Sequence, residues 1–355
     1  MKKYNFNAGP SILPGEVIEQ AIKDIRDFRG NGLSILEISH RAKYYEPVIA
    51  EAESLLRELL AVPENYSIFF LGGGASTQFY LIPFNFLATR AGYVNTGVWS
   101  KKAIKEAQAV GAVEVLASSE DKNFTYIPKG FAIPTDLDYL HITTNNTIYG
   151  TEFHTDIDSP VPLIADMSSD ILSRPVDVSK YAMIYGGAQK NMGPAGAAFV
   201  IIRNDMLDVQ ARKLPAMMQF KTHAEGHSMY NTPPVFTIYA ICEVLKWVKA
   251  EGGVAAIHKR NALKAGMLYD EIDRNPMFQS VAVPEDRSLM NVCFVMAKGK
   301  EELADKFMAL CNERGIVGVK GHRLVGGFRA SLYNALPVGH VEYLVKVMHE
   351  FEKQN

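Results

Sequence analysis

Apolar positions along this 355-residue chain switch between helical spacing and short uninterrupted runs. Apolar residues recur every three to four positions over 14–25 and 46–60, which predicts two amphipathic helices. Short apolar runs bounded by Gly, Pro or polar residues predict buried strands. These runs cover 67–71, 91–96, 140–144, 163–166, 182–185 and 197–202. Helices alternating with buried strands predict an α/β fold with a largely parallel sheet.

The pattern changes beyond about residue 250. The elements predicted there are a long helix at 255–274, a strand at 291–297, a helix at 301–314, strands near 316–319 and 328–332, and a closing helix at 338–351. Together they predict a smaller α+β unit. Because one core usually stops growing at ~250–300 residues, a chain of this length is expected to form two domains. We predict a large domain over 15–250 and a small domain formed by 1–14 and 251–355.

Composition and charge exclude several classes of protein. Hydrophobic residues make up 48% and charged residues 21%, as in ordinary globular proteins, and the net charge of −2 lacks the basic excess of nucleic-acid binders. No apolar stretch approaches the ~18 residues of a membrane span, and no apolar run follows Lys2 and Lys3 as in a signal peptide. Cys242, Cys293 and Cys311 lack metal-site spacing and indicate inert thiols in a reducing compartment. We expect a cytoplasmic protein that binds no metal, nucleic acid or membrane.

A glycine-rich turn is the first feature that suggests chemistry. Gly73-Gly74-Ala75-Ser76-Thr77 lies between a predicted strand and a predicted helix. Small residues there let a phosphate approach the N–H groups at a helix N-terminus, where the partial charge is positive. An ordinary tight turn is the alternative interpretation.

Asp166 and Lys190 are the second and third features. Asp166 ends the apolar strand 163–166, where a carboxylate can meet a buried cation, although helix capping is a common role for such a residue. Lys190 lies in the glycine-rich segment 185–196. Such a loop admits a ligand, and partial burial lowers a lysine pKa toward the nucleophilic range, which favours Schiff-base formation with carbonyls. A solvated loop lysine is the alternative.

The three features together supply what pyridoxal phosphate requires. The glycine turn would bind the phosphate, Asp166 would keep the pyridine nitrogen protonated, and Lys190 would form the covalent bond. A further set of cations near predicted turns indicates an anionic substrate with more than one acidic end. This set consists of His40, Arg41, His322, Arg323 and Arg329.

On these residues and several motifs, the sequence resembles the phosphoserine aminotransferases, a family of class V aminotransferases. The motifs are Asn5-Phe6-Asn7-Ala8-Gly9-Pro10, Glu37-Ile38-Ser39-His40-Arg41, Asn145-Asn146-Thr147, Gln189-Lys190-Asn191, Tyr230-Asn231-Thr232-Pro233 and Arg329-Ala330-Ser331-Leu332-Tyr333-Asn334-Ala335. The resemblance spans nearly the whole chain. It implies fold type I of the pyridoxal phosphate enzymes, with a mostly parallel, seven-stranded sheet in the large domain.

The resemblance also implies how the cofactor is held. Trp99 would stack on the pyridine ring, although a core tryptophan is the alternative for this position. Thr147 would hydrogen-bond the phenolic oxygen. The phosphate would be bound by Ala75, Ser76 and Gln189 of the same chain and by Asn231 and Thr232 of a partner subunit. A homodimer with composite sites follows from this arrangement.

The implied reaction is amino transfer from L-glutamate to 3-phosphohydroxypyruvate, giving O-phospho-L-serine and 2-oxoglutarate in serine biosynthesis. His40, Arg41, His322, Arg323 and Arg329 would bind the substrate anions, and this chain has Ser76 where some members carry an additional arginine. A second activity on the phosphorylated 2-oxo acid of pyridoxine synthesis is left open. The alternatives are a serine–glyoxylate type of transaminase, a cysteine desulfurase and a non-catalytic protein that binds pyridoxal phosphate.

Overall fold

The computed structural model describes residues 3–355, so residues 1 and 2 of the predicted small domain lie outside the described residues. A seven-stranded sheet forms the centre of the fold, in the order β2-β10-β9-β8-β5-β3-β4. Its strands are β2 (Tyr66–Gly72), β3 (Arg90–Asn95), β4 (Ala112–Ser118), β5 (Leu140–Thr143), β8 (Leu163–Asp166), β9 (Met183–Gly187) and β10 (Ala197–Arg203). Strand β10 is antiparallel to both its neighbours, and the other neighbouring pairs are parallel. The predicted α/β fold is confirmed.

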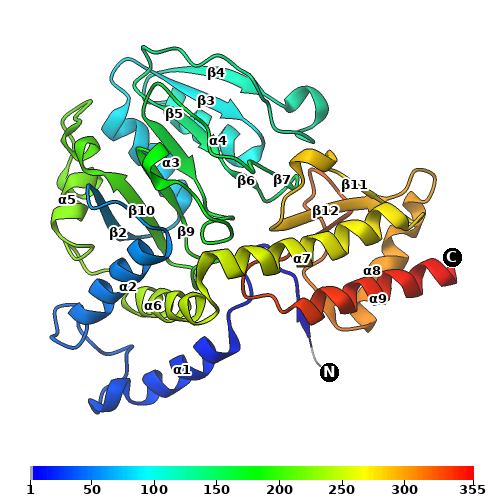
Figure 1. The fold of residues 1–355 in the computed structure, drawn as a ribbon. Coiled ribbons are helices and arrows are strands. Elements are labelled where there is room, and N and C mark those ends of the chain that lie inside the picture. The colour runs from blue at the N-terminus through cyan, green and yellow to red at the C-terminus, as the bar shows by residue number, and fades with distance from the viewer. Residues whose placement is uncertain (1–2) are drawn as a thin grey trace.

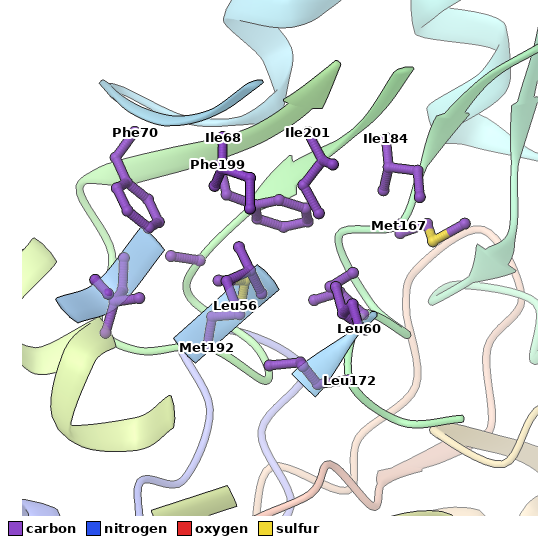
Figure 2. Packing of buried hydrophobic residues seen from close by; sticks show 14 of the residues in the cluster. Leu56, Leu60, Ile68, Phe70, Met167, Leu172, Ile184, Met192, Phe199 and Ile201 are labelled. Carbon is purple, nitrogen blue, oxygen red and sulfur yellow. The ribbon is translucent and has the colours of Figure 1, made fainter. Parts of the chain in front are cut away.

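Helices cover both faces of this sheet (Figure 1). Helices α2 (Glu46–Leu59) and α6 (Val235–Ala250) pack on one face, and α3 (Ala75–Phe86) and α4 (Val98–Gln108) pack on the other. Successive residues of a strand point to opposite faces, so Phe199 and Ile201 of β10 contact the α2 side while Val200 faces the α3 side. Figure 2 shows Leu56 of α2 facing Phe199 and Ile201.

The burial of both faces of the sheet by helices explains the apolar pattern of the sequence. Strands buried on both faces carry continuous apolar runs, whereas strands buried on one face alternate. The runs therefore marked the central strands to within a few residues. Edge strand β4 is largely exposed and mixes polar with apolar residues, so it did not stand out. Helix α4 was also not predicted, and the predicted helix at 301–314 is divided into a 3-10 turn at Glu301–Leu303 and α8 (Ala304–Glu313).

The C-terminal elements form a second, smaller unit with its own core. Its three-stranded antiparallel sheet has the order β11-β12-β14, and an aromatic cluster of Phe278, Phe294, Phe307, Phe328 and Phe351 fills its centre. The elements are α7 (Gly253–Arg274), β11 (Phe278–Ser280), β12 (Asn291–Met296), α8, β13 (Ile316–Val317), β14 (Phe328–Ser331) and α9 (Val338–Gln354).

The N-terminal segment joins this smaller unit. Strand β1 (Tyr4–Asn5) pairs in parallel with β13, and the ring of Tyr4 stacks on that of Tyr343 in α9. Helix α1 (Gly15–Arg26) instead packs against α6 through Val17. The domain limits near residues 14 and 250 remain our proposal, and they fall in the connections before α1 and between α6 and α7. Within residues 3–355, no helix is both long and apolar enough to cross a membrane.

A buried asparagine ties the two units together near Lys190. The side chain of Asn334 donates to the carbonyl of Leu172 at 3.0 Å and accepts from the Asn261 amide at 2.8 Å. Its backbone N–H donates to the side chain of Asn191, the residue after Lys190, at 3.0 Å. These contacts connect the end of β14 to the lysine loop.

We predict that Asn334→Ala lowers the free energy of unfolding by about 2–4 kcal/mol, because Leu172 and Asn261 each lose a buried partner. Urea unfolding followed by circular dichroism measures the change. Asn312→Ala is the control, since Asn312 is exposed on α8. Equal stability of the two variants would contradict the prediction.

Candidate active site

Chemistry-bearing residues meet at the carboxyl edge of the central sheet. Strands β2, β3, β5, β8 and β9 all point in the same direction, so the segments that follow them lie along one edge. A cavity of about 140 Å³ opens there. Its lining includes Ala75, Ser76, Trp99, Asp166, Gln189 and Lys190. Six residues chosen from the sequence therefore share one cavity.

The glycine turn provides the anion-binding end of this cavity. Gly73 has a φ of 108°, a backbone conformation that favours glycine, and Gly74 is the N-cap of α3. The first turn of the helix is closed by the Thr77 N–H, which donates to the Gly74 carbonyl at 3.1 Å. The N–H groups of Ala75 and Ser76 precede that bond and form the positive end of the helix dipole. A phosphate in the cavity can reach this helix N-terminus, because Gly74, Ala75 and Ser76 all line it.

Lys190 lies in the turn that follows β9, with its amine directed to the cavity. The Nζ atom donates to Thr147 Oγ1 at 2.8 Å and lies 6.0 Å from the centroid of the Trp99 ring. The pKa of Lys190 is lowered to about 8, mainly by burial; the charge of Asp166 opposes this lowering, and the charge of Arg329 adds to it. An amine with this pKa is a competent nucleophile and proton carrier near neutral pH.

The N-terminal segment holds the backbone of the lysine turn. The Ser11 hydroxyl donates to the Lys190 carbonyl at 2.5 Å, and the Ser11 N–H donates to the Gln189 carbonyl at 3.0 Å. A Cβ atom on Gly9 would come within 3.6 Å of the Lys190 side chain. From the sequence, the motif at residues 5–10 had no role beyond the family resemblance. In the structure, this segment lies directly against the lysine.

Asp166 is buried at the end of β8 and is held by Ser168. The Ser168 N–H and hydroxyl donate to Asp166 Oδ1 at 2.9 Å and 2.5 Å. Burial raises the pKa of Asp166, while the two Ser168 hydrogen bonds and the charge of Lys190 stabilise the carboxylate. Sequence reasoning missed Ser168, although its place two residues after Asp166 is typical of a residue that caps a carboxylate.

These residues fit pyridoxal phosphate. The helix N-terminus suits its phosphate, Lys190 suits its aldehyde, and the buried Asp166 suits a protonated ring nitrogen. The Trp99 indole lines the cavity, and its buried Nε1 has no hydrogen-bond partner among the described residues. An indole left without a polar partner beside a cavity is better suited to stacking on a ligand than to a core position. Within residues 3–355, no cluster of His, Cys, Asp or Glu is arranged to hold a metal ion.

The predicted substrate cations fall into two groups. Arg329 Nη1 donates to the Thr147 carbonyl at 3.1 Å, which places its guanidinium beside the Lys190 amine. His322 and Arg323 lie close enough to Arg329 that the two arginine charges, after burial, lower the pKa of His322. His40 and Arg41 lie in the turn before α2, outside the residues that line the cavity.

Asn231 and Thr232 also lie outside the cavity. Both are exposed, and Asn231 lines a separate hollow of about 270 Å³ that includes Gly72 and Thr77. That hollow lies beside the glycine turn, but its lining does not include Lys190. Within one chain, the structure does not bring Asn231, Thr232, His40 or Arg41 to the lysine.

Comparisons with known proteins agree with this fold. The family described as aminotransferase class-V matches residues 3–344. The phosphoserine aminotransferase of Phocaeicola vulgatus is 59% identical over 354 residues, and that of Bacteroides thetaiotaomicron is 60% identical over 353 residues; each alignment covers 99% of both chains. The solved phosphoserine aminotransferase from Bacillus circulans subsp. alkalophilus superposes with a TM-score of 0.96 at 45% identity, covering 99% of both chains. The pyridoxal phosphate-bound enzyme from Trichomonas vaginalis gives 0.94 at 40% identity, covering 98% of this chain and 100% of that one.

Fold and site define a pyridoxal phosphate-dependent transaminase of fold type I. The chain belongs to the class V aminotransferases, and within them to the phosphoserine aminotransferase family.

The lowered pKa of Lys190 predicts how cofactor uptake by the apoprotein depends on pH. Only the neutral amine attacks an aldehyde, and its fraction rises as the pH increases through about 8. The rate of pyridoxal phosphate uptake is therefore expected to rise with pH and to level off above this midpoint. Stopped-flow absorbance measures the rate. A midpoint near the value of about 10.4 for a free lysine would contradict the prediction.

Proposed function

We propose that the protein transfers the amino group of L-glutamate to 3-phosphohydroxypyruvate, producing O-phospho-L-serine and 2-oxoglutarate for serine biosynthesis. The observation that carries this proposal is the position of Arg329, His322 and Arg323 beside the Lys190 cavity. Both substrates are multiply anionic, and guanidinium groups bind carboxylate and phosphate equally well. The names of the family members at 59–60% identity support the same reaction.

Different residues of the site have separate roles in the proposed reaction. When bound, pyridoxal phosphate supplies an aldehyde for covalent attachment and a ring that accepts electrons from the substrate α-carbon. Lys190 would remove the proton from the substrate α-carbon, and Thr147 Oγ1 accepts a hydrogen bond that holds the Lys190 Nζ atom in place. Asp166 keeps a proton on the ring nitrogen through its buried negative charge. Arg329 orients the substrate beside the lysine.

A half-reaction tests the proposal. The holoenzyme is mixed with O-phospho-L-serine, and the visible absorbance of the bound cofactor is followed. We expect loss of the absorbance with phosphoserine and with glutamate, but a much slower change with serine. Faster conversion of serine would support the serine–glyoxylate alternative and overturn the proposal. Cofactor binding without any conversion would support a non-catalytic protein.

A desulfurase function is disfavoured by the cysteines. Cys242, Cys293 and Cys311 are all buried, and burial raises the pKa of each thiol to about 12. A desulfurase requires an accessible thiolate, which these positions do not provide.

A second substrate is compatible with the same site. The phosphorylated 2-oxo acid of pyridoxine synthesis also combines a keto acid with a phosphate, so it presents the same anionic groups to the cations. Reversing the half-reaction with that keto acid, using the aminated cofactor form of the enzyme, tests this activity. Recovery of the visible absorbance is the expected result.

We also propose a homodimer with composite sites, located in the cytoplasm as expected for a protein with free thiols. Exposed apolar side chains support the dimer; they include Ile18, Ile22 and Ile25 of α1, with Leu33, Leu36 and Tyr44. The positions of Arg41, Asn231 and Thr232, away from the lysine of their own chain, suit residues that complete a partner's site.

Mixed dimers test the composite sites. Inactive Lys190→Ala protomers are mixed with inactive Asn231→Ala or Arg41→Ala protomers under conditions of subunit exchange. Recovery of about one quarter of the wild-type activity is expected, because a random mixture forms half heterodimers, each with one intact site. No recovery, with exchange verified by mass spectrometry, would count against shared sites.

A further inference from the structure

Lys102 is a cation at the active site that the sequence did not single out. It lies one helical turn after Trp99 on α4, and its Nζ atom is 4.5 Å from the centroid of the Trp99 ring. Trp99 itself lines the cavity that contains Lys190. The ammonium group thus lies within cation–π distance of the same aromatic side chain that we assign to cofactor stacking.

The loop that carries His322 and Arg323 reaches the same place from the small unit. Val325 of this loop and Trp99 at the start of α4 pack against the same buried cluster, which consists of Phe124, Ile148 and Tyr149. The loop is closed by hydrogen bonds, with the Gly321 N–H donating to the Gly327 carbonyl and the Gly326 N–H to the His322 carbonyl, both at 2.8 Å. The position of its cations relative to α4 is therefore set by packing and backbone bonds.

The pKa of His322 also shows that Lys102 lies close to this loop. After burial, the charges of Arg329, Arg323 and Lys102 all lower the pKa of His322. Three cationic side chains, those of Lys102, Arg323 and Arg329, therefore lie near His322. Among residues 3–355, no carboxylate lies within ion-pair distance of Lys102, His322, Arg323 or Arg329. Lys101, the neighbour of Lys102, is by contrast paired with Glu120.

Like charges held together without a counter-charge repel one another, and a bound anion relieves this repulsion. Arg329 is half-buried and donates to the carbonyl of Thr147, whose hydroxyl contacts Lys190, whereas Lys102 is exposed on α4. A substrate held covalently near Lys190 has one carboxylate beside the reacting carbon and a second anion at its far end. The outer cations match that second anion.

We propose that Lys102 binds the distal anion of the substrate and favours a phosphate dianion over a carboxylate. This inference rests on the proposed function of the site. Lys102 is a specificity-determining residue, because a doubly charged phosphate gains about twice the Coulomb attraction of a singly charged carboxylate at equal distance.

The test compares Lys102→Met with a matched control, Lys105→Met. Both lysines are exposed on α4, and both substitutions remove one positive charge and keep an unbranched side chain. We expect Lys102→Met to raise the KM for phosphoserine roughly 5- to 20-fold, within the range of a charge-assisted hydrogen bond at a partly exposed site. The KM for glutamate should rise about half as much on a logarithmic scale, and kcat should stay within about twofold of wild type.

A binding measurement provides a readout independent of turnover. Calorimetry of the holoenzyme with 3-phosphoglycerate, which has both anionic ends but no amino or keto group, should show the same loss of affinity in Lys102→Met. Wild-type Kd should also weaken as salt is raised, and less steeply in the variant. An unchanged KM and Kd in Lys102→Met, or an equal loss in Lys105→Met, would overturn the proposal. Failure of the proposed function is distinct, because the wild-type enzyme would then not convert phosphoserine.

Discussion

Lys190→Ala is expected to reduce amino transfer by about 10²–10⁴-fold through loss of proton transfer alone. The variant also loses the covalent attachment of the cofactor. Lys190 is the only amine among the residues that line the cavity, and its Nζ atom is positioned by Thr147 at 2.8 Å. The other ionisable side chain of the lining, that of Asp166, is assigned to the ring nitrogen of the cofactor. Steady-state kinetics and the visible spectrum after addition of pyridoxal phosphate measure the two losses separately.

A small amine distinguishes a chemical defect from a structural one. Ethylamine added to Lys190→Ala fills the space of the missing side chain and supplies a base, so part of the activity should return. Lys105→Ala, a change on the exposed face of α4, serves as the control and should retain wild-type turnover. Wild-type activity in Lys190→Ala would refute the role of this lysine.

Asp166→Asn is expected to lower kcat by about 10²–10³-fold, the cost of removing one preorganised electrostatic contact from an active site. The amide has nearly the same shape as the carboxylate but carries no charge to hold a proton on the ring nitrogen. Asp166 is 4% exposed, so water does not replace the lost charge. Rapid-quench measurement of the half-reaction reports on the chemical step directly.

The same variant should alter the titration of Lys190. Because the charge of Asp166 raises the pKa of Lys190, its removal should move the midpoint of cofactor uptake below pH 8. A purely structural role would leave this midpoint unchanged. Ser168→Ala provides a graded comparison, since it removes the hydroxyl bond to Asp166 but keeps the N–H bond at 2.9 Å. Its effect on kcat should be smaller than that of Asp166→Asn.

Asp166, the glycine turn and Lys190 could be predicted because each is recognisable from the residues next to it in the sequence. A strand buried on both faces is a continuous apolar run, so the strand that ends at Asp166 was visible, as was the glycine turn after β2. Lys190 stood out because a turn rich in glycine surrounds it. Edge strand β4 and helix α4 were missed, since exposed edges and helix starts have weaker patterns.

Residue types and spacing by themselves determined the α/β class, the lysine, the buried carboxylate and the glycine turn. Only the tertiary structure decided which residues meet. Parallel strands bring Ser76, Trp99, Asp166 and Lys190 to one edge although more than a hundred positions separate the first from the last. The physical reason is that strand direction and helix packing set these distances, and both depend on contacts between segments remote in the sequence.

Contacts between remote segments also brought cations to the site whose importance could not be judged from the sequence. Arg329 of β14 reaches the Thr147 carbonyl in the turn after β6 (Asn145–Asn146). Lys102 lies near the His322 loop because Trp99 and Val325 pack against the same buried aromatic cluster. In the sequence, Lys102 is one of several lysines in a polar stretch. A surface charge acquires a specific role only when folding surrounds it with other charges of the same sign.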